Sequence, residues 1–309
     1  MKNFIIKTLI ALTIVGSCHA IAALFANGAT DPFYLRFTRG PYSSMVLGSS
    51  RAAQGVIPTV LDKVLSSDLY DGELFNFSFT RDNSPYGPAY LGAIVKKLDK
   101  NSTNGLYILA VDPWVLSMPI GITDFPENDM QPGNMSNVTS NPNLEYLIRN
   151  YNYAWGSLIG GPFSTKDTVQ FLHDDGWLEI NVPMDSISMA LRFSRKLKEY
   201  EDLATKEMEY SIERVLYLEK TINYLKPYGK VVLVRIPMDA GIRSIEDQFR
   251  PDFSAEMDEL AKKHNVLYVD DTDNNEKYDY TDGNHLAATS APLYSGWLAN
   301  YIKRSSDPN

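Results

Sequence analysis

Short apolar segments that alternate with stretches of helical spacing constrain this chain more than any other feature. The apolar segments have the length and composition of buried strands and lie at residues 44–48, 73–77, 105–111, 230–236 and 265–269. The stretches with helical spacing lie at residues 52–65, 90–98, 195–224 and 292–303. This alternation predicts an α/β fold, a three-layer α/β/α sandwich in which helices cover both faces of a mostly parallel sheet.

An uncharged apolar run at residues 8–26 precedes these segments and has the length needed to cross a hydrocarbon core. Because Lys2 and Lys7 come before it, we expect the N-terminus to stay in the cytoplasm and the rest of the chain to be exported. A cleaved signal peptide is the alternative, although its apolar region is normally shorter. A lipoprotein signal ending at Cys18 is a third, but the apolar residues beyond that cysteine count against it.

The sequence therefore divides into an N-terminal anchor or signal at residues 1–27 and one α/β domain at residues 28–309. Within the domain, residues 117–176 are rich in Pro, Asn and Gly and lack a core pattern. Long irregular segments of this kind are usually functional or disordered. We interpret residues 117–176 as an irregular insertion that covers the mouth of the site.

Composition excludes some partners and cross-links. The net charge of −9 and the lack of Lys/Arg clusters argue against a nucleic-acid partner, whose phosphates require basic patches. The single cysteine, Cys18, lies in the apolar run, so the domain has no disulfide. Compartment must be inferred from the targeting segment, which indicates a membrane-anchored protein with its domain in the periplasm or at the cell surface, or a secreted protein if the segment is cleaved.

A candidate nucleophile lies in the segment Gly48-Ser49-Ser50-Arg51, between the first strand and a helix. Ligands of open parallel sheets bind beyond the carboxyl ends of the strands, where this segment is expected. A serine at such a turn exposes its hydroxyl, and its backbone N–H points toward a developing oxyanion. The alternative is that the serine only caps the helix.

A candidate base follows the last strand, where Asp282 and His285 are three residues apart. At a helical turn the two side chains can face each other, and the carboxylate can hold the imidazole in the tautomer that removes a serine proton. The alternative makes Asp282 a turn residue and His285 a polar group satisfied beneath the loop.

Together, the serine after the first strand and the Asp-x-x-His before the last helix resemble the SGNH/GDSL hydrolase superfamily over roughly residues 44–303. The sequence is most similar to the divergent branch with Gly-Ser-Ser-Arg in its first block, which includes cell-envelope O-acyltransferase-like proteins. The resemblance implies a catalytic triad of Ser50, Asp282 and His285. Ser49 stands where the family usually has Asp, which leaves a shift of one residue open.

Two positions depart from the family. Its second block supplies a glycine N–H to the oxyanion, and Ser78 is the nearest counterpart here. Its third block supplies an asparagine, whereas this chain has Asp112, which either lines the site or caps the turn that follows. Loss of one oxyanion donor costs ~100- to 1000-fold in rate, so another donor, with Asn76 and Asn83 as candidates, or a low activity is expected.

The remaining polar and aromatic candidates have weaker signals. Arg51 either contacts an anionic substrate group or is a solvated residue of the first helical turn. Residues 173–175, a His-Asp-Asp cluster, lack further ligands nearby, so we expect no metal and no cofactor. Four aromatic residues either stack on a sugar or pack within the insertion; these are Tyr151, Tyr153, Trp155 and Trp177.

The sequence thus predicts a serine ester hydrolase or O-acyltransferase that acts on ester-linked acyl groups, with cell-envelope carbohydrate as the substrate implied by the resemblance. The alternative is a non-catalytic carbohydrate-binding or polysaccharide assembly protein that keeps the fold with an impaired oxyanion hole. A phosphotransferase or nucleotide-binding protein is discounted because the sequence has no Gly-x-x-x-x-Gly-Lys segment.

Overall fold

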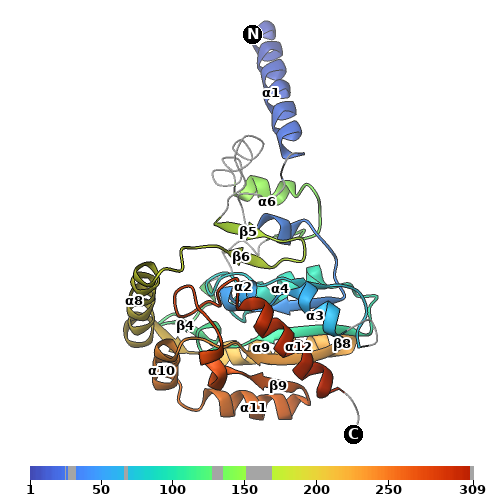
Figure 1. Ribbon diagram of the computed structural model, residues 1–309. Helices are drawn as coiled ribbons and strands as arrows, with labels where there is room; N and C mark the ends of the chain where they lie inside the picture. The colour runs from blue at the N-terminus through green and yellow to red at the C-terminus, as the bar shows by residue number, and fades with distance from the viewer. Residues whose placement is uncertain (25, 27–32, 66–68, 127–134, 151–168, 307–309) are drawn as a thin grey trace.

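A parallel sheet forms the centre of the computed structural model, which describes residues 1–24, 26, 33–65, 69–126, 135–150 and 169–306 (Figure 1). Five strands lie in the order β2-β1-β3-β8-β9, and every neighbouring pair is parallel. Their bounds are β1 Ser44–Leu47, β2 Leu74–Asn76, β3 Gly105–Ala110, β8 Gly229–Arg235 and β9 Leu267–Asp270. The α/β fold with a parallel sheet, predicted from the alternating segments, is confirmed.

Helices cover both faces of this sheet because successive strand residues point to opposite sides. On one face, residues such as Met45 and Leu109 pack against three helices, α4 Pro88–Lys97, α9 Ile212–Leu225 and α11 Phe253–His264. On the other face, residues such as Val46 and Ile108 pack against α2 Ser50–Gly55, α3 Pro58–Leu65 and α12 Ala291–Arg304. The result is the three-layer arrangement.

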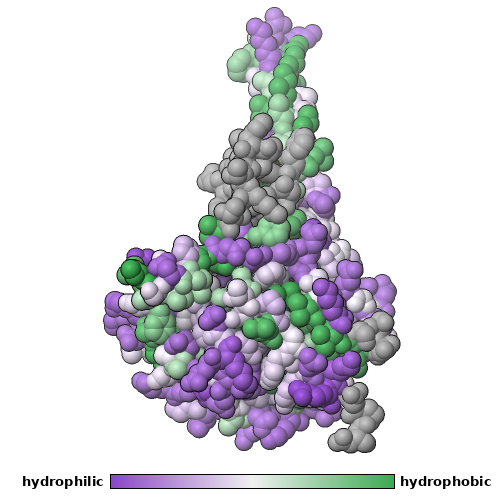
Figure 2. Space-filling model, in the orientation of Figure 1, coloured by the Kyte–Doolittle hydropathy of each residue, from purple (hydrophilic) through white to green (hydrophobic). Residues whose placement is uncertain are grey.

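The N-terminal helix α1, Lys2–Ala23, projects away from the α/β domain (Figure 1). Apolar side chains cover much of its surface (Figure 2), and Ala23 at its end is buried against the domain. By length and composition it is the one helix of the described residues that could cross a membrane. Such a helix suits either a signal sequence or an anchor.

Two predicted helices are each divided in the structure. The helix expected at 52–65 is α2 and α3, because Pro58 lacks a backbone N–H and restricts the residue before it. The prediction of a single helix at residues 195–224 is wrong. There α8, Ser186–Asp202, passes into a π-helical turn, Leu203–Glu207, before α9 begins with Ser211 as its N-cap.

A short strand, β7 Met208–Tyr210, lies between that turn and α9 and pairs antiparallel with β4, Ser117–Pro119. A second two-stranded sheet joins β5, Gln170–Leu172, to β6, Leu178–Ile180. Neither pair was predicted, because three-residue strands are too short to show periodicity. The helix α10, Ala240–Phe249, also went unpredicted, as did α11.

The described parts of segment 117–176 include β4, β5 and the helix α6, Leu144–Arg149. Four side chains of this segment are buried in the largest core cluster, namely Met135, Val138, Tyr146 and Leu147. The expectation that the segment lacks a core pattern is therefore wrong for residues 135–147. Shorter 3₁₀ turns complete the fold at Tyr34–Phe37, Trp114–Leu116, Lys226–Tyr228 and Thr272–Lys277.

Candidate active site

Ser50 begins α2, at the carboxyl end of the central part of the sheet. In the turn before it, Gly48 has a φ of +148°, and a Cβ there would lie 2.7 Å from the Cβ of Ala110. Glycine thus lets the start of α2 come close to β3. No hydrogen bond joins the backbone N–H of Ser50 to an acceptor in the described part of the chain.

The hydroxyl of Ser50 lies within hydrogen-bond distance of the imidazole of His285, and this imidazole lies within hydrogen-bond distance of the carboxylate of Asp282. Ser50 Oγ lies 2.8 Å from His285 Nε2, and His285 Nδ1 lies 3.0 Å from Asp282 Oδ2. An ionised carboxylate only accepts hydrogen bonds, so Nδ1 carries the proton and Nε2 is free to accept from the serine. We call these three residues the Ser–His–Asp cluster.

Asp282 and His285 lie in an irregular loop and not in the helical turn expected from their spacing. Asp282 Oδ1 accepts the backbone N–H groups of Asn284 and His285, at 3.0 Å each, and so closes the loop on itself. Gly283 makes this possible with a φ of +84°, a conformation that side chains disfavour.

Electrostatics keep Asp282 ionised. Burial raises its pKa, but the electrostatic interaction and the hydrogen bonds with His285, together with the ammonium of Lys196, hold the pKa well below its usual value. Lys196 Nζ lies 3.8 Å from Asp282 Oδ2. A carboxylate that stays charged can stabilise an imidazolium beside it.

The helix α8 covers the loop of the Ser–His–Asp cluster. Arg192 Nε donates a 2.7 Å hydrogen bond to the carbonyl of Thr281. The ring of Phe193 packs closely on Gly283, where a Cβ would lie only 2.4 Å from the nearest ring atom. The loop is thus held by contacts with α8 as well as by its own hydrogen bonds. Figure 1 shows α8 and α10 side by side at this edge of the domain.

Arg51 is buried, with 3% of its surface exposed, so the expectation of a solvated first-turn residue is wrong. Its Nη2 lies 2.6 Å from Glu246 Oε1, and Glu246 Oε2 accepts a 3.0 Å hydrogen bond from Arg235. Trp114 Nε1 also donates to Glu246 Oε1, at 2.8 Å. Although burial opposes it, the carboxylate raises the pKa of Arg51, and the two guanidinium groups lower the pKa of Glu246.

Asn284 connects this buried group, which we call the Glu246 network, to the Ser–His–Asp cluster. Its Oδ1 accepts from Arg51 Nε at 2.7 Å and from Tyr200 Oη at 2.6 Å. Its Nδ2 lies 3.1 Å from His285 Nε2. Sequence reasoning missed this residue, and its position next to His285 was the only signal that could have drawn attention to it.

The expected oxyanion positions are engaged elsewhere. Both donors of Ser78 have other partners, since its N–H donates to Asn76 Oδ1 and its hydroxyl to the Val46 carbonyl. The amide of Asn76 donates to the carbonyl of Ala52 in α2 and to the carbonyl of Val56, the residue after α2. Asp112 caps the turn after β3 by accepting the N–H groups of residues 114 and 115. Asn83 is half-buried, and its backbone N–H donates to the hydroxyl of Thr80 at 3.3 Å.

The remaining sequence candidates have structural partners where they are described. His173 pairs with Glu179 at 2.7 Å, and Asp174 pairs with Arg39 at 2.6 Å. Within the described ranges no group of three or more potential ligands is placed to hold a metal ion. Trp177 packs against His173 and donates to the Gln54 carbonyl. Residues 151, 153 and 155 lie outside the described residues.

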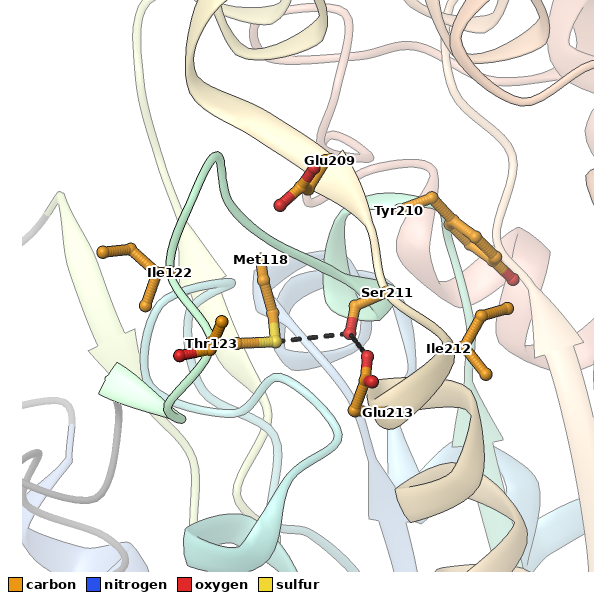
Figure 3. A pocket seen from close by; sticks show the side chains of 8 residues that line it. All are labelled: Met118, Ile122, Thr123, Glu209, Tyr210, Ser211, Ile212 and Glu213. Atoms are coloured by element: carbon orange, nitrogen blue, oxygen red, sulfur yellow. Dashed lines mark hydrogen bonds between the residues drawn. The ribbon is translucent and has the colours of Figure 1, made fainter.

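A separate cavity of about 310 Å³ is lined by residues of the paired strands β4 and β7 and of the segments that follow them (Figure 3). Ser211 donates there to Glu213 Oε2 at 3.1 Å and contacts the sulfur of Met118 at 3.2 Å. None of the residues that line the cavity belongs to the Ser–His–Asp cluster. Ser211 has a carboxylate and a thioether as partners and lacks the oriented imidazole that pairs with Ser50, so the Ser–His–Asp cluster and not this cavity is the candidate active site.

Comparisons with known proteins find few similarities. No protein-family model matches the chain, and no curated protein sequence matches it. Among solved structures, Est24, a carbohydrate acetylesterase from Sinorhizobium meliloti, is similar over 85% of this chain and 99% of its own. The two are 14% identical, with a TM-score of 0.36. Such a distant likeness carries no argument about activity, so the class of protein rests on the sheet and the site described above.

Proposed function

We propose that the protein is a serine-dependent esterase or O-acyltransferase that acts on ester-linked acyl groups. The observation that carries the proposal is the hydrogen-bonded sequence from Ser50 Oγ through His285 to Asp282, with distances of 2.8 and 3.0 Å. A nucleophile within hydrogen-bond reach of a base that a third group orients is the arrangement that activates a serine.

In the first half-reaction Ser50 Oγ attacks the ester carbonyl carbon, and its proton passes to His285 Nε2. Asp282 remains ionised and stabilises the imidazolium. The tetrahedral intermediate then collapses, the bond to the leaving alkoxide breaks, and Nε2 returns the proton to that oxygen. The acyl group is left as an ester on Ser50.

In the second half-reaction an acceptor O–H gives its proton to His285 Nε2 as its oxygen attacks the acyl carbon. The bond to Ser50 breaks, and the serine oxygen recovers the proton from the imidazolium. Water as the acceptor yields a carboxylic acid, whereas a carbohydrate hydroxyl yields a new ester. The same cluster therefore supports hydrolysis and transfer.

Cell-envelope carbohydrate is the proposed substrate, because the sequence resembles envelope acyltransferase-like proteins and the chain carries an apolar N-terminal helix. Lys2 and Lys7 at the start of that helix favour export of everything after it. Phosphatase and fluorescent-protein fusions after residue 309 test the orientation. Phosphatase activity outside the cytoplasm supports it, and fluorescence confined to the cytoplasm contradicts it.

A non-catalytic carbohydrate-binding protein is the second candidate, favoured by the loss of both usual oxyanion donors. A serine-reactive fluorophosphonate probe on the full-length protein separates the two. The wild type and Ser49→Ala should label, whereas Ser50→Ala should not, with little change in thermal stability. Labelling that depends on Ser49 in place of Ser50 moves the nucleophile by one residue. A wild type that never labels rejects the enzyme in favour of the binding protein.

A further inference from the structure

The orientation of the Asn284 side chain is determined by its neighbours. Arg51 Nε is a donor and cannot accept, so the atom 2.7 Å from it must be the amide oxygen. The hydroxyl of Tyr200 donates to the same oxygen. The NH₂ group therefore faces His285 Nε2, which is also the acceptor for Ser50 Oγ.

Two donors thus share one acceptor. A neutral imidazole has a single lone pair at Nε2, and both Ser50 Oγ–H and Asn284 Nδ2–H point toward it. When Ser50 attacks, its proton fills that lone pair, and Nε2 becomes a donor. The Asn284 amide then loses its acceptor at the step in which the carbonyl oxygen of the substrate becomes negative.

We propose that Asn284 is a catalytic residue that donates its Nδ2–H to this oxyanion, in place of the asparagine that the chain lacks after β3. The inference rests on the proposed function. The backbone N–H of Ser50 supplies a second donor from the start of α2. Asn284 Nδ2 lies 3.1 Å from the imidazole nitrogen that Ser50 Oγ contacts at 2.8 Å, so the amide is placed beside the serine at which the charge forms.

The Glu246 network holds the amide in position before the reaction. Asn284 is 3% exposed, and Arg51, which fixes its oxygen, is itself held by the buried carboxylate of Glu246. Tyr200 adds a second hydrogen bond and lies beneath the Arg51 guanidinium, with 5.8 Å from that group to the ring centroid. A donor fixed in this way needs no reorganisation when charge develops, which is the source of most oxyanion stabilisation.

The main test uses Asn284→Ala and Asn284→Asp, with Asn83→Ala as the matched control. Asn83 is another asparagine near the turn of Ser50, because the hydroxyl of its neighbour Ser84 donates to the Gly48 carbonyl. Hydrolysis of p-nitrophenyl acetate and the rate of fluorophosphonate labelling are measured on the full-length proteins. Both Asn284 variants should lose ~100- to 1000-fold in kcat/KM, and Asn83→Ala less than about threefold.

A double-mutant cycle separates an oxyanion donor from a residue that only positions His285. In a His285→Ala background, Asn284→Ala should still lower the residual rate by about tenfold or more, because oxyanion stabilisation persists without the base. No further loss in that background overturns the inference and makes Asn284 a positioning residue. Asn284→Asp keeps the shape of the side chain, so its loss of activity at an unchanged melting temperature excludes misfolding.

The outcomes also separate this inference from the proposed function. A labelled wild type with indifferent Asn284 variants overturns only the role of Asn284. A large loss in Asn83→Ala with no loss in Asn284→Ala assigns the donor to the loop after β2 and also overturns the role of Asn284. A wild type that reacts no faster than Ser50→Ala rejects the enzyme and the inference together.

Discussion

Buried cations lie at both ends of the sheet, and the protein neutralises them in different ways. At the carboxyl end, Arg51 and Arg235 share the carboxylate of Glu246. Near the amino end of β1, Lys97 is fully buried, and its ammonium donates to the carbonyls of residues 39 and 138 and lies near aromatic rings, with Phe77 5.1 Å away; within the described residues no carboxylate pairs with it. At the carboxyl end, the paired charges fix the positions of side chains in the candidate active site. At the other end, burial of the Lys97 ammonium lowers the stability of the fold.

This difference has a physical basis in the partners. A guanidinium keeps its charge when it is buried and can form two hydrogen bonds with one carboxylate, so it fixes geometry. An ammonium without a carboxylate instead shifts its pKa, and burial lowers the pKa of Lys97 to about 7. Four variants, arranged from the largest expected effect to the smallest, test whether the two ends differ in this way.

Asp282→Asn should have the largest effect, on activity. The amide keeps the shape of the carboxylate but removes the charge that stabilises the imidazolium, so kcat should fall roughly 10,000-fold. The melting temperature should change little. Ester turnover and thermal unfolding of the same samples check both statements, and activity within tenfold of the wild type would show that this carboxylate is not part of the mechanism.

Glu246→Gln should have the largest effect on stability. It leaves two buried guanidinium groups without their shared counter-charge, so the free energy of unfolding should fall by about 3 to 5 kcal/mol. Urea unfolding at constant m-value measures the loss. Asp247→Asn is the control, because Asp247 lies 3.5 Å from the same Arg235 but is 46% exposed, and it should cost less than about 1 kcal/mol. Equal losses would contradict a special role for the buried carboxylate.

The Lys97 end should make stability depend on pH above neutrality, where the carboxylates of Asp282 and Glu246 no longer titrate. Between pH 7 and its ordinary pKa the unfolded chain holds a proton that the folded protein has lost, so the free energy of unfolding rises with pH. The slope from this group is at most about 1.4 kcal/mol per pH unit, and the full cost is present below pH 7. Lys97→Met should remove that slope in urea unfolding between pH 7 and 9. An unchanged slope would assign the pH dependence to other groups.

Lys196→Gln should have the smallest effect. The ammonium is 3.8 Å from Asp282, its side chain is 19% exposed, and its shorter contact is with Glu199 at 2.8 Å. Removing a long, partly solvated pair should cost less than about 1 kcal/mol of stability and less than tenfold in kcat. A loss close to that of Asp282→Asn would mean that Lys196 contacts substrate.

The sheet was predictable because its central strands are buried on both faces, which makes them near-continuous apolar runs such as residues 105–111. Ser50 and the Asp282–His285 pair were predictable as candidates because they follow strands in such a sheet. The break between α8 and α9 was not, since apolar residues keep helical spacing across residues 203–210 although the backbone leaves the helix to pair with β4.

The groups that support the site could not be predicted for a different reason. Arg51 at the start of a helix looks like a solvated charge, and nothing local indicates that Glu246 is its partner far along the chain. Asn284 likewise gains its orientation from Arg51 and Tyr200, two residues on other elements. Local pattern describes periodicity and turns, whereas these contacts exist only once the tertiary fold brings α2, α8 and α10 together.

The contact between Ser50 and His285 also has a consequence for synthesis. The two residues are 235 positions apart, so Ser50 leaves the ribosome long before His285 and Asp282. Until then the hydroxyl is an ordinary alcohol with no acceptor to take its proton. Under the proposed function, a nascent or prematurely terminated chain would therefore lack an activated serine, which would form only when the late loop docks against α2.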